Sequence, residues 1–245
     1  SDGRVLRLLR GMLQAGVLAD GQRLPTEQGT PQGGIVSPLL SNILLTPFDR
    51  EMRRRGYRLT RYADDWVVTC QTRAEAERAL TEATVLLKTL GVTLNADKTR
   101  IVHVQVGFEF LGYKIKRGTR PLRLAPDKIR SGVRSGALYA YPRQKSIQHF
   151  KEQIRQRTRR KAPVAIPELV AQVNPVIRGW GLYYHKTHVR KLFAQLDRWI
   201  LHRLWSQRFK RWRCRGWQRL PERHLYGGLG LVRLIALIPS IHLRL

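Results

Sequence analysis

Two adjacent aspartates, Asp64 and Asp65, are the residues of this chain best suited to hold a metal ion. They lie between the runs Tyr57–Arg61 and Trp66–Cys70, in which apolar and polar residues alternate. Such runs on either side of a short turn predict a β-hairpin with both acids at its tip. Carboxylates supply the oxygen ligands that suit Mg²⁺, and a cation neutralises two acids held side by side. A solvated Asp-Asp turn is the alternative, because short motifs also match by chance.

Two further segments carry residues that suit the binding of a nucleotide. Gln32, Gly33 and Gly34 form a glycine-rich segment, and glycines allow a backbone to approach a ligand closely. Lys98 follows a turn and can face pyrophosphate, although a solvated lysine fits the residue type equally well. With the carboxylates, these segments predict a site for nucleotidyl transfer, in which metal ions activate a 3′-hydroxyl and stabilise the leaving oxygen.

The elements that must position these residues can be read from hydrophobic periodicity and from turn residues. Up to the middle of the chain, the pattern mixes helices with short hairpins. We expect a first helix ending near Gly16, a second with Ser37 as N-cap and Pro38 at its first position, an amphipathic helix over Arg73–Leu90, a strand over Ile101–Val106 and a hairpin over Phe108–Ile115.

Helices take over from Ser135 onward. Each expected helix has an apolar stripe that suits a core, and the first and last of the three also have a basic side that suits phosphate. The expected helices are Ser146–Arg160, Ile166–Tyr184 and Val189–Trp212. The chain therefore has an α+β first part and an all-α second part.

The charge balance predicts a polyanionic partner. Lys and Arg number 46 and Asp and Glu number 17, which gives a formal net charge of +29. Aromatic residues are interleaved with the cations, a combination that suits phosphate contacts and stacking on unpaired bases, although many aromatics also serve a core. This set comprises Trp199, Trp205, Phe209, Trp212 and Trp217.

Cysteine usage and hydropathy bear on the compartment. Cys70 and Cys214 are isolated, which favours a reducing compartment and offers no zinc site. No apolar run approaches the roughly 20 residues that span a bilayer, so we expect a soluble, intracellular protein of a bacterial cytoplasm or an organelle, with no membrane partner. The chain begins with Ser1 in what reads as a helix, and we expect it to be the remainder of a longer protein.

The motifs together resemble those of reverse transcriptases, and more narrowly those encoded by group II introns. Four motifs occur in the order of that family, and the helical, basic remainder is similar to the family's thumb and maturase domain. The residues that carry the resemblance are Gly29–Ile43, Arg61–Asp65, Leu94–Asn95 with Lys98–Thr99, Phe110–Tyr113, Asn174–Pro175, Gly179–Trp180, Tyr183–Tyr184 and Leu196–Ile200.

The resemblance implies a role for each candidate residue. Asp64 and Asp65 would hold Mg²⁺, with Asp64 the firmer ligand, and Lys98 would lie near the triphosphate as a catalytic residue. The remaining site residues would contact substrate: Gln32, Gly33, Gly34 and Tyr62 beside the nucleotide and template, and Phe110, Leu111 and Gly112 as a primer grip ending at Tyr113. The implied partners are intron RNA, an RNA template with a DNA primer, and dNTPs.

The implied domains are a partial polymerase palm over residues 1–118 and a basic helical thumb and maturase domain over residues 119–245. The implied function is RNA-directed DNA synthesis by the protein of a mobile element, with a maturase role in RNA splicing. The family needs a third aspartate from an earlier strand, and Asp2 and Asp20 lack the required strand context, so we expect weak polymerisation or none by this chain alone. The rival hypotheses are a splicing cofactor that binds intron RNA without catalysis and a generic RNA-binding protein.

Overall fold

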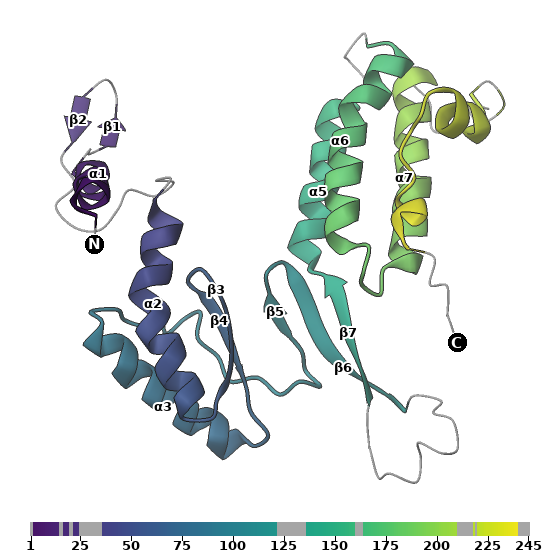
Figure 1. The fold of residues 1–245 in the computed structure, drawn as a ribbon. Coiled ribbons are helices and arrows are strands. Elements are labelled where there is room, and N and C mark those ends of the chain that lie inside the picture. Colours follow the sequence, from purple (N-terminus) through teal and green to yellow (C-terminus); the bar gives the residue numbers. More distant parts are fainter. Residues whose placement is uncertain are drawn as a thin grey trace. The chain divides into compact units, whose positions relative to one another are not determined.

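The computed structural model forms two compact units, Ser1–Ile101 and Val102–Leu245, built from helices and small antiparallel sheets (Figure 1). It describes residues 2–14, 17–19, 22–24, 36–121, 136–159, 164–209, 218 and 220–239. The mixture of helices and antiparallel strands confirms the predicted α+β class in its coarse form. No helix within these ranges has the length and apolar character needed to cross a membrane.

The first unit contains a helix and a small hairpin, followed by two helices that flank a second hairpin. Its elements are α1 (Gly3–Leu13), β1 (Val17–Ala19), β2 (Gln22–Leu24), α2 (Ser37–Arg54), β3 (Arg58–Tyr62), β4 (Asp65–Thr69) and α3 (Arg73–Thr89). Asp2 caps α1 by accepting a hydrogen bond from the Arg4 amide at 2.9 Å, which is a structural use of this acid.

Helix α2 begins one residue earlier than predicted. Val36 is the N-cap and Ser37 is the first helical residue, so the prediction of Ser37 as N-cap is wrong. Pro38 still lies in the first turn, where a missing N–H leaves no helical hydrogen bond unmade. The helix continues past the internal Pro47 to Arg54, because its buried residues Leu45, Phe48 and Met52 pack into the core of the unit.

Helix α3 confirms the amphipathic helix expected over Arg73–Leu90. Thr72 caps it by accepting from the Glu75 amide at 3.1 Å, and Gly91 follows it with a φ of 72°, a conformation that favours glycine. Helices α2 and α3 pack on the β3–β4 hairpin, whose Leu59 is buried with them. This core fixes the hairpin on one side and leaves the other side to solvent.

The second unit starts with a three-stranded antiparallel sheet in the order β5 (Phe108–Phe110), β6 (Tyr113–Pro121) and β7 (Gly136–Pro142). The hairpin predicted over Phe108–Ile115 is confirmed by the pairing of Phe110 with Tyr113. The prediction of helices alone from Ser135 is wrong for β7, which pairs along β6. The predicted domain limit after residue 118 falls inside β6.

The strand predicted over Ile101–Val106 is wrong. These residues form irregular chain and a turn, in which the His103 carbonyl accepts from the amides of Val106 at 2.9 Å and Gly107 at 3.2 Å. Local turn bonds therefore take the place of a ladder with another strand.

Among the residues described in the second unit, three long helices and two short helical turns follow the sheet. They are α5 (Gln144–Arg157), α6 (Ile166–Tyr184), α7 (Arg190–Phe209), the π-helical η1 (His224–Gly228) and the 3₁₀-helical η2 (Leu234–Leu237). The bounds of α6 match the prediction, α5 starts and ends two to three residues early, and the predicted end of α7 at Trp212 lies outside the described residues.

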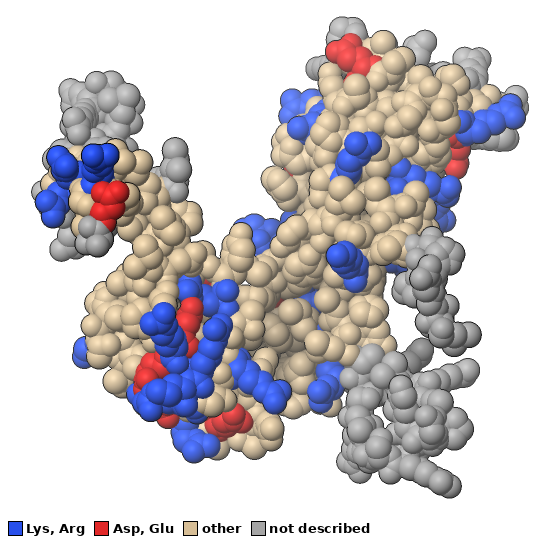
Figure 2. All heavy atoms as spheres, viewed as in Figure 1, with Lys and Arg blue, Asp and Glu red and all other residues tan. Residues whose placement is uncertain are grey.

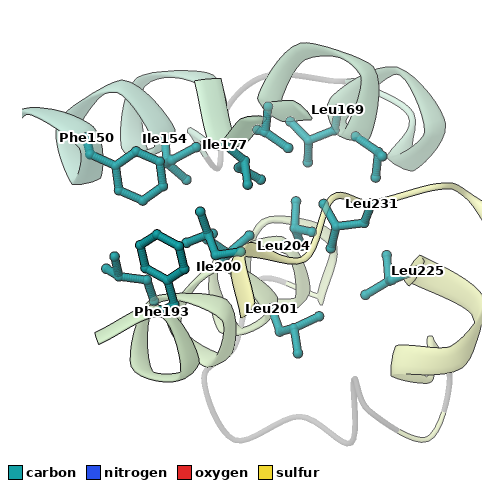
Figure 3. Close-up of a cluster of buried hydrophobic side chains, with 14 of the residues drawn as sticks. Phe150, Ile154, Leu169, Ile177, Phe193, Ile200, Leu201, Leu204, Leu225 and Leu231 are labelled. Carbon is teal, nitrogen blue, oxygen red and sulfur yellow. The ribbon is translucent and has the colours of Figure 1, made fainter. Parts of the chain in front are cut away.

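The predicted apolar stripes of these helices meet in one core (Figure 3). Phe150 and Ile154 of α5 and Ile177 of α6 face Phe193 and Ile200 of α7 in this view. The C-terminal segment closes the core with Leu225 and Leu231, which are 0% and 4% exposed. Burial of this apolar surface is the main contribution to the stability of the helical part.

Candidate functional site

The two aspartates lie at the end of the β3–β4 hairpin, as predicted, but they differ in position. Tyr62 pairs with Asp65, so Ala63 and Asp64 form a two-residue turn and Asp65 is the first residue of β4. The prediction that both acids occupy the tip is therefore correct for Asp64 alone. Both side chains are exposed to solvent.

Ala63 holds this turn in an unfavourable backbone conformation. Its φ is 53°, and glycine is the usual residue at the first position of a two-residue hairpin turn with positive φ. A non-glycine residue keeps such a conformation only when its surroundings impose it, and these residues concentrate at functional sites.

Arg61 supplies the contacts that hold the turn. Its Nη1 donates to the Ala63 carbonyl at 2.7 Å and to Oδ1 of Asn42 at 2.8 Å. Its Nε and Nη2 donate to the two carboxylate oxygens of Asp49 at 2.8 and 2.6 Å. The Arg61 side chain is only 9% exposed, and the hydrogen bond with Asp49 raises its pKa. Arg61 therefore fastens α2 to the turn that carries Asp64.

Sequence reasoning included Arg61 in the motif but did not find this bracing role. A signal existed in the sequence. Arg61 lies two residues after the buried Leu59 in β3, so both side chains are on the face of the strand that packs on the helices. An arginine on the core side of a strand requires a buried acceptor, and Asp49 lies in α2 between Phe48 and Met52, which are both buried.

The opposite side of the hairpin is open. Tyr62 lies across from Asp65 and is 67% exposed, so a large aromatic ring stands in solvent beside the carboxylates. Trp66 points to the helix side, where its ring meets that of Phe48 edge-on at 5.4 Å. The alternation thus separates an accessible acidic face from a packed one.

The donor set fits Mg²⁺ in one particular mode. Within the described residues, no group of three or more His, Cys, Asp and Glu side chains could hold a metal. Mg²⁺ keeps several waters and is commonly bound by one or two carboxylates together with substrate phosphates. Asp64 and Asp65 match that mode, in which the nucleotide completes the coordination.

Lys98 lies in a turn that Asn95 organises. Oδ1 of Asn95 accepts from the amides of Asp97 at 3.0 Å and Lys98 at 3.2 Å. The Lys98 side chain is exposed and makes no ion pair with another residue that the structure describes. The other predicted nucleotide contacts, Gln32, Gly33 and Gly34, lie outside the described residues.

The predicted primer grip is a tight turn in the second unit. Leu111 and Gly112 link β5 to β6 with φ values of 48° and 79°, the signs of a type I′ turn. The hydroxyl of Tyr183 donates to the Leu111 carbonyl at 2.8 Å, and that of Tyr184 donates to the Gly112 carbonyl at 3.1 Å. The sequence motifs included both tyrosines, but their contact with this turn was not predicted.

Lys and Arg side chains form several patches on the visible surface of each unit, and Asp and Glu side chains are fewer there (Figure 2). On the helices, Lys151 and Arg155 lie over the ring of Trp199 at 5.7 and 5.8 Å from its centroid. Trp205 is half-buried and donates to the Leu220 carbonyl at 2.9 Å, which gives it a structural role. The side chains of Phe209, Trp212 and Trp217 lie outside the described residues.

Comparison with known protein families gives two matches along the chain. Residues 5–115 match the family model of the reverse transcriptase (RNA-dependent DNA polymerase), and residues 147–225 match that of the group II intron, maturase-specific domain. The first match contains the Asp64 hairpin and the Leu111 turn, and the second contains α6 and α7.

Three curated proteins show the range of similarity. Protein YkfC of Escherichia coli (strain K12) is 33% identical over 152 residues, which cover 48% of this chain and 40% of that protein. An uncharacterized 91 kDa protein in the cob intron of Schizosaccharomyces pombe is 23% identical over 270 residues, covering 79% and 32%. The group II intron-encoded protein LtrA of Lactococcus lactis subsp. cremoris is 24% identical over 215 residues, covering 61% and 36%.

The chain thus spans about a third to two fifths of the length of these relatives. Its two matches follow one another in the order expected from the sequence motifs, the polymerase segment first and the maturase segment second. With an intron-encoded protein among the relatives, residues 5–115 are assigned to the reverse transcriptase family and residues 147–225 to the family of group II intron maturase-specific domains.

Proposed function

We propose that this chain forms the catalytic hairpin, the primer-contacting turn and the RNA-binding helices of a reverse transcriptase that copies RNA into DNA. The observation that carries the proposal is the strained Ala63–Asp64 turn, which Arg61 braces so that Asp64 and Asp65 face solvent beside Tyr62. Solvated acidic turns need neither positive φ at a non-glycine residue nor a buried arginine brace.

In this proposal, Asp64 is the principal ligand of Mg²⁺ and Asp65 is the second acid of the site. The metal would supply positive charge against the triphosphate, so that the primer 3′-hydroxyl displaces pyrophosphate. Lys98 would bind or protonate the leaving pyrophosphate, and Tyr62 with Gln32, Gly33 and Gly34 would border the nucleotide and template. The Leu111–Gly112 turn would hold the primer end.

The helical part would bind intron RNA. We assign residues 1–118 to the palm and residues 119–245 to the thumb and maturase function. Three features support RNA binding: the match to the maturase-specific domain, the excess of Lys and Arg, and the exposed basic sides of α5 and α7. The Lactococcus relative is named as an intron-encoded protein, which agrees with an intron RNA as the partner.

Primer extension tests the enzymatic proposal. The chain is incubated with Mg²⁺, dNTPs, an RNA template and a labelled DNA primer, beside Asp64→Ala, Asp65→Ala and the control Glu77→Ala, which removes an exposed acid from α3. Extension should disappear in Asp64→Ala, fall strongly in Asp65→Ala and persist in Glu77→Ala. Extension that survives Asp64→Ala would overturn the assignment of the catalytic site.

A second function, splicing assistance without polymerisation, is favoured by the maturase match alone. It predicts that intron RNA binding and splicing are the same in Asp64→Ala and in the unchanged chain, and that neither extends a primer. The two functions therefore separate on primer extension by an N-terminally extended version of the chain: polymerisation predicts extension that requires Asp64, and splicing assistance predicts none.

A further inference from the structure

Two neighbouring tyrosines at the end of α6 contact the Leu111–Gly112 turn through their hydroxyl groups. We propose that Tyr183 and Tyr184 are positioning residues that hold this turn in its left-handed conformation through their hydroxyl groups, so that α6 sets how the turn is presented to a primer. The role of the turn in presenting a primer rests on the proposed function. The contacts of Tyr183 and Tyr184 with the turn, here called the clamp, rest on the geometry of the second unit alone.

Tyr183 and the hairpin exchange two hydrogen bonds, one in each direction. The hydroxyl of Tyr183 donates to the Leu111 carbonyl at 2.8 Å, and the hydroxyl of Tyr113 donates back to the Tyr183 carbonyl at 2.6 Å. The two rings stack with centroids 5.2 Å apart and planes 22° apart. Burial beside the two tyrosines raises the pKa of Tyr113 to about 12, so its hydroxyl keeps the proton that it donates.

The second half anchors the turn to the helical core. Tyr184 is 3% exposed, and its Oη lies 3.1 Å from the Gly112 carbonyl and 2.9 Å from Oγ of Ser146. Oγ of Ser146 also accepts from Nε1 of Trp180 at 3.1 Å. The Tyr184 hydroxyl is thus within donor distance of both the Gly112 carbonyl and Oγ of Ser146. This chain of bonds joins α5, α6 and the turn.

The turn requires such a clamp because of its backbone. Leu111 has a φ of 48°, which is unfavourable for a residue with a Cβ, and Gly112 has a φ of 79° with a position for Cβ only 2.9 Å from Oη of Tyr184. The Arg143 amide also donates to the Gly112 carbonyl at 2.9 Å. The carbonyls of both turn residues are thus fixed by groups outside the hairpin.

The clamp connects the Leu111–Gly112 turn to the core of the helices. Tyr184 packs in the same cluster as Val173, Ile177 and Phe193, so its hydroxyl is carried by the core of α6 and α7. The β5–β6 hairpin has only three residue pairs between its strands, so it has little rigidity of its own. The helices therefore determine where the turn carbonyls and the Leu111 side chain point, and a thumb that moves on its substrate would carry the turn with it.

The test removes single hydroxyls and keeps the rings. Tyr183→Phe, Tyr184→Phe and the double variant are compared with Tyr141→Phe, a control on β7 whose hydroxyl makes no hydrogen bond with another described residue. The first readout is amide hydrogen exchange. The second is binding of a labelled RNA–DNA duplex with a recessed primer 3′ end, measured by fluorescence anisotropy against the same duplex with blunt ends.

In each single variant, amides of residues 108–117 should exchange about fivefold faster, the scale of one neutral hydrogen bond, while residues 193–204 of α7 stay as in the unchanged chain. The preference for the recessed end should fall by a similar factor in each single variant and further in the double variant. Tyr141→Phe should change neither readout.

Unchanged exchange at residues 108–117 would overturn the clamp, as would faster exchange that includes residues 193–204, because the tyrosines would then serve the core alone. An unchanged chain that does not prefer the recessed end would overturn the primer-grip part of the proposed function, and the exchange data would still decide the clamp.

Discussion

Positive φ at residues other than glycine marks both turns that the sequence motifs single out. Among the described residues, this conformation occurs at Ala63 and at Leu111. In each case a side chain from another part of the unit, or from the flanking strand, binds the carbonyl of the strained residue: Arg61 for Ala63 and Tyr183 for Leu111. Strain held by specific donors is a physical property of candidate catalytic positions that a motif alone does not reveal.

Arg61→Lys tests the brace of the Ala63–Asp64 turn. Lysine keeps the charge but cannot reach Asp49, Asn42 and the Ala63 carbonyl at once, so the unit should lose about 1–3 kcal/mol of unfolding free energy. Chemical denaturation measures this change, and the Mg²⁺ concentration needed for primer extension should rise as well. Arg58→Lys, at an exposed position of the same strand, should change neither quantity. Equal effects of the two variants would contradict the brace.

Gly112→Ala tests the turn of the second unit. Gly91→Ala is the matched control, because Gly91 has a similar φ of 72° but no atom within 4 Å of its Cβ position. We expect the control to lose about 1–2 kcal/mol from backbone strain, and Gly112→Ala to lose more because its Cβ meets Oη of Tyr184. In a Tyr184→Phe background, the excess for Gly112→Ala should shrink in chemical denaturation. An excess that stays the same would mean that the contact is unimportant.

At the scale of elements, Asp197 joins α7 to the short η2 turn. Its carboxylate accepts from the amides of Leu234 at 2.8 Å and Ile235 at 3.1 Å, and its side chain is buried. Burial raises the pKa of Asp197, and the two amides and Arg233 lower it in part. The acid was noted in the sequence within the Leu196–Ile200 motif, and its contacts indicate a structural cap.

Asp197→Ala should lower the free energy of unfolding by about 2–4 kcal/mol, since two buried amides lose their acceptor. The pH dependence has a defined sign. Because the folded pKa is raised, ionisation of Asp197 favours the unfolded state, so this contribution to stability is complete below the ordinary pKa of 3.8 and is lost as the pH rises through the folded value.

Thermal or chemical unfolding across that pH range checks the sign. Asp197→Asn cannot ionise, so the difference in stability between it and the unchanged chain should move in favour of the variant as the pH rises. Glu109→Gln, at an exposed position of β5, serves as the control. A shift in the opposite direction would show that hydrogen bonds to the ionised carboxylate outweigh its burial.

An element could be predicted when the residues that stabilise it lie close together in the sequence. Helices α3 and α6 were predicted because each has an apolar stripe within a single segment, and α3 also has a local side-chain cap in Thr72. Strand β7 was missed because it depends on pairing with β6, and Ile101–Val106 was overpredicted because strand-like composition does not supply a partner strand.

The candidate site divides in the same way. Asp64, Asp65 and Lys98 were predicted as site residues because their residue types suit the chemistry and their spacing matches a family. Arg61 with Asp49 and Tyr183 with Leu111 were not assigned roles, since the partners are 12 and 72 residues apart in sequence. Contacts of that separation become visible only when the core that brings them together is known.

At the scale of the whole molecule, the net charge of +29 sets the expected mode of association with RNA. Each phosphate that a Lys or Arg neutralises releases bound counterions, so affinity should fall steeply as salt rises. Cations without an acidic neighbour should contribute most. On α5, Lys145 and Lys151 make no ion pair with another described residue, whereas Arg54 pairs with Glu51 at 2.7 Å and Arg73 pairs with Glu77 at 2.8 Å.

Two double variants that remove equal charge test this distinction. Lys145→Gln with Lys151→Gln should reduce the slope of log affinity against log salt concentration by about 0.7–0.9 for each RNA phosphate that the protein no longer neutralises. Arg54→Gln with Arg73→Gln should reduce it less, because each of those arginines already has a carboxylate partner. Binding to a structured RNA, titrated from low to physiological salt, gives both slopes. Equal slopes for the two double variants would indicate that total charge alone governs binding, and an affinity insensitive to salt would refute electrostatic binding by this surface.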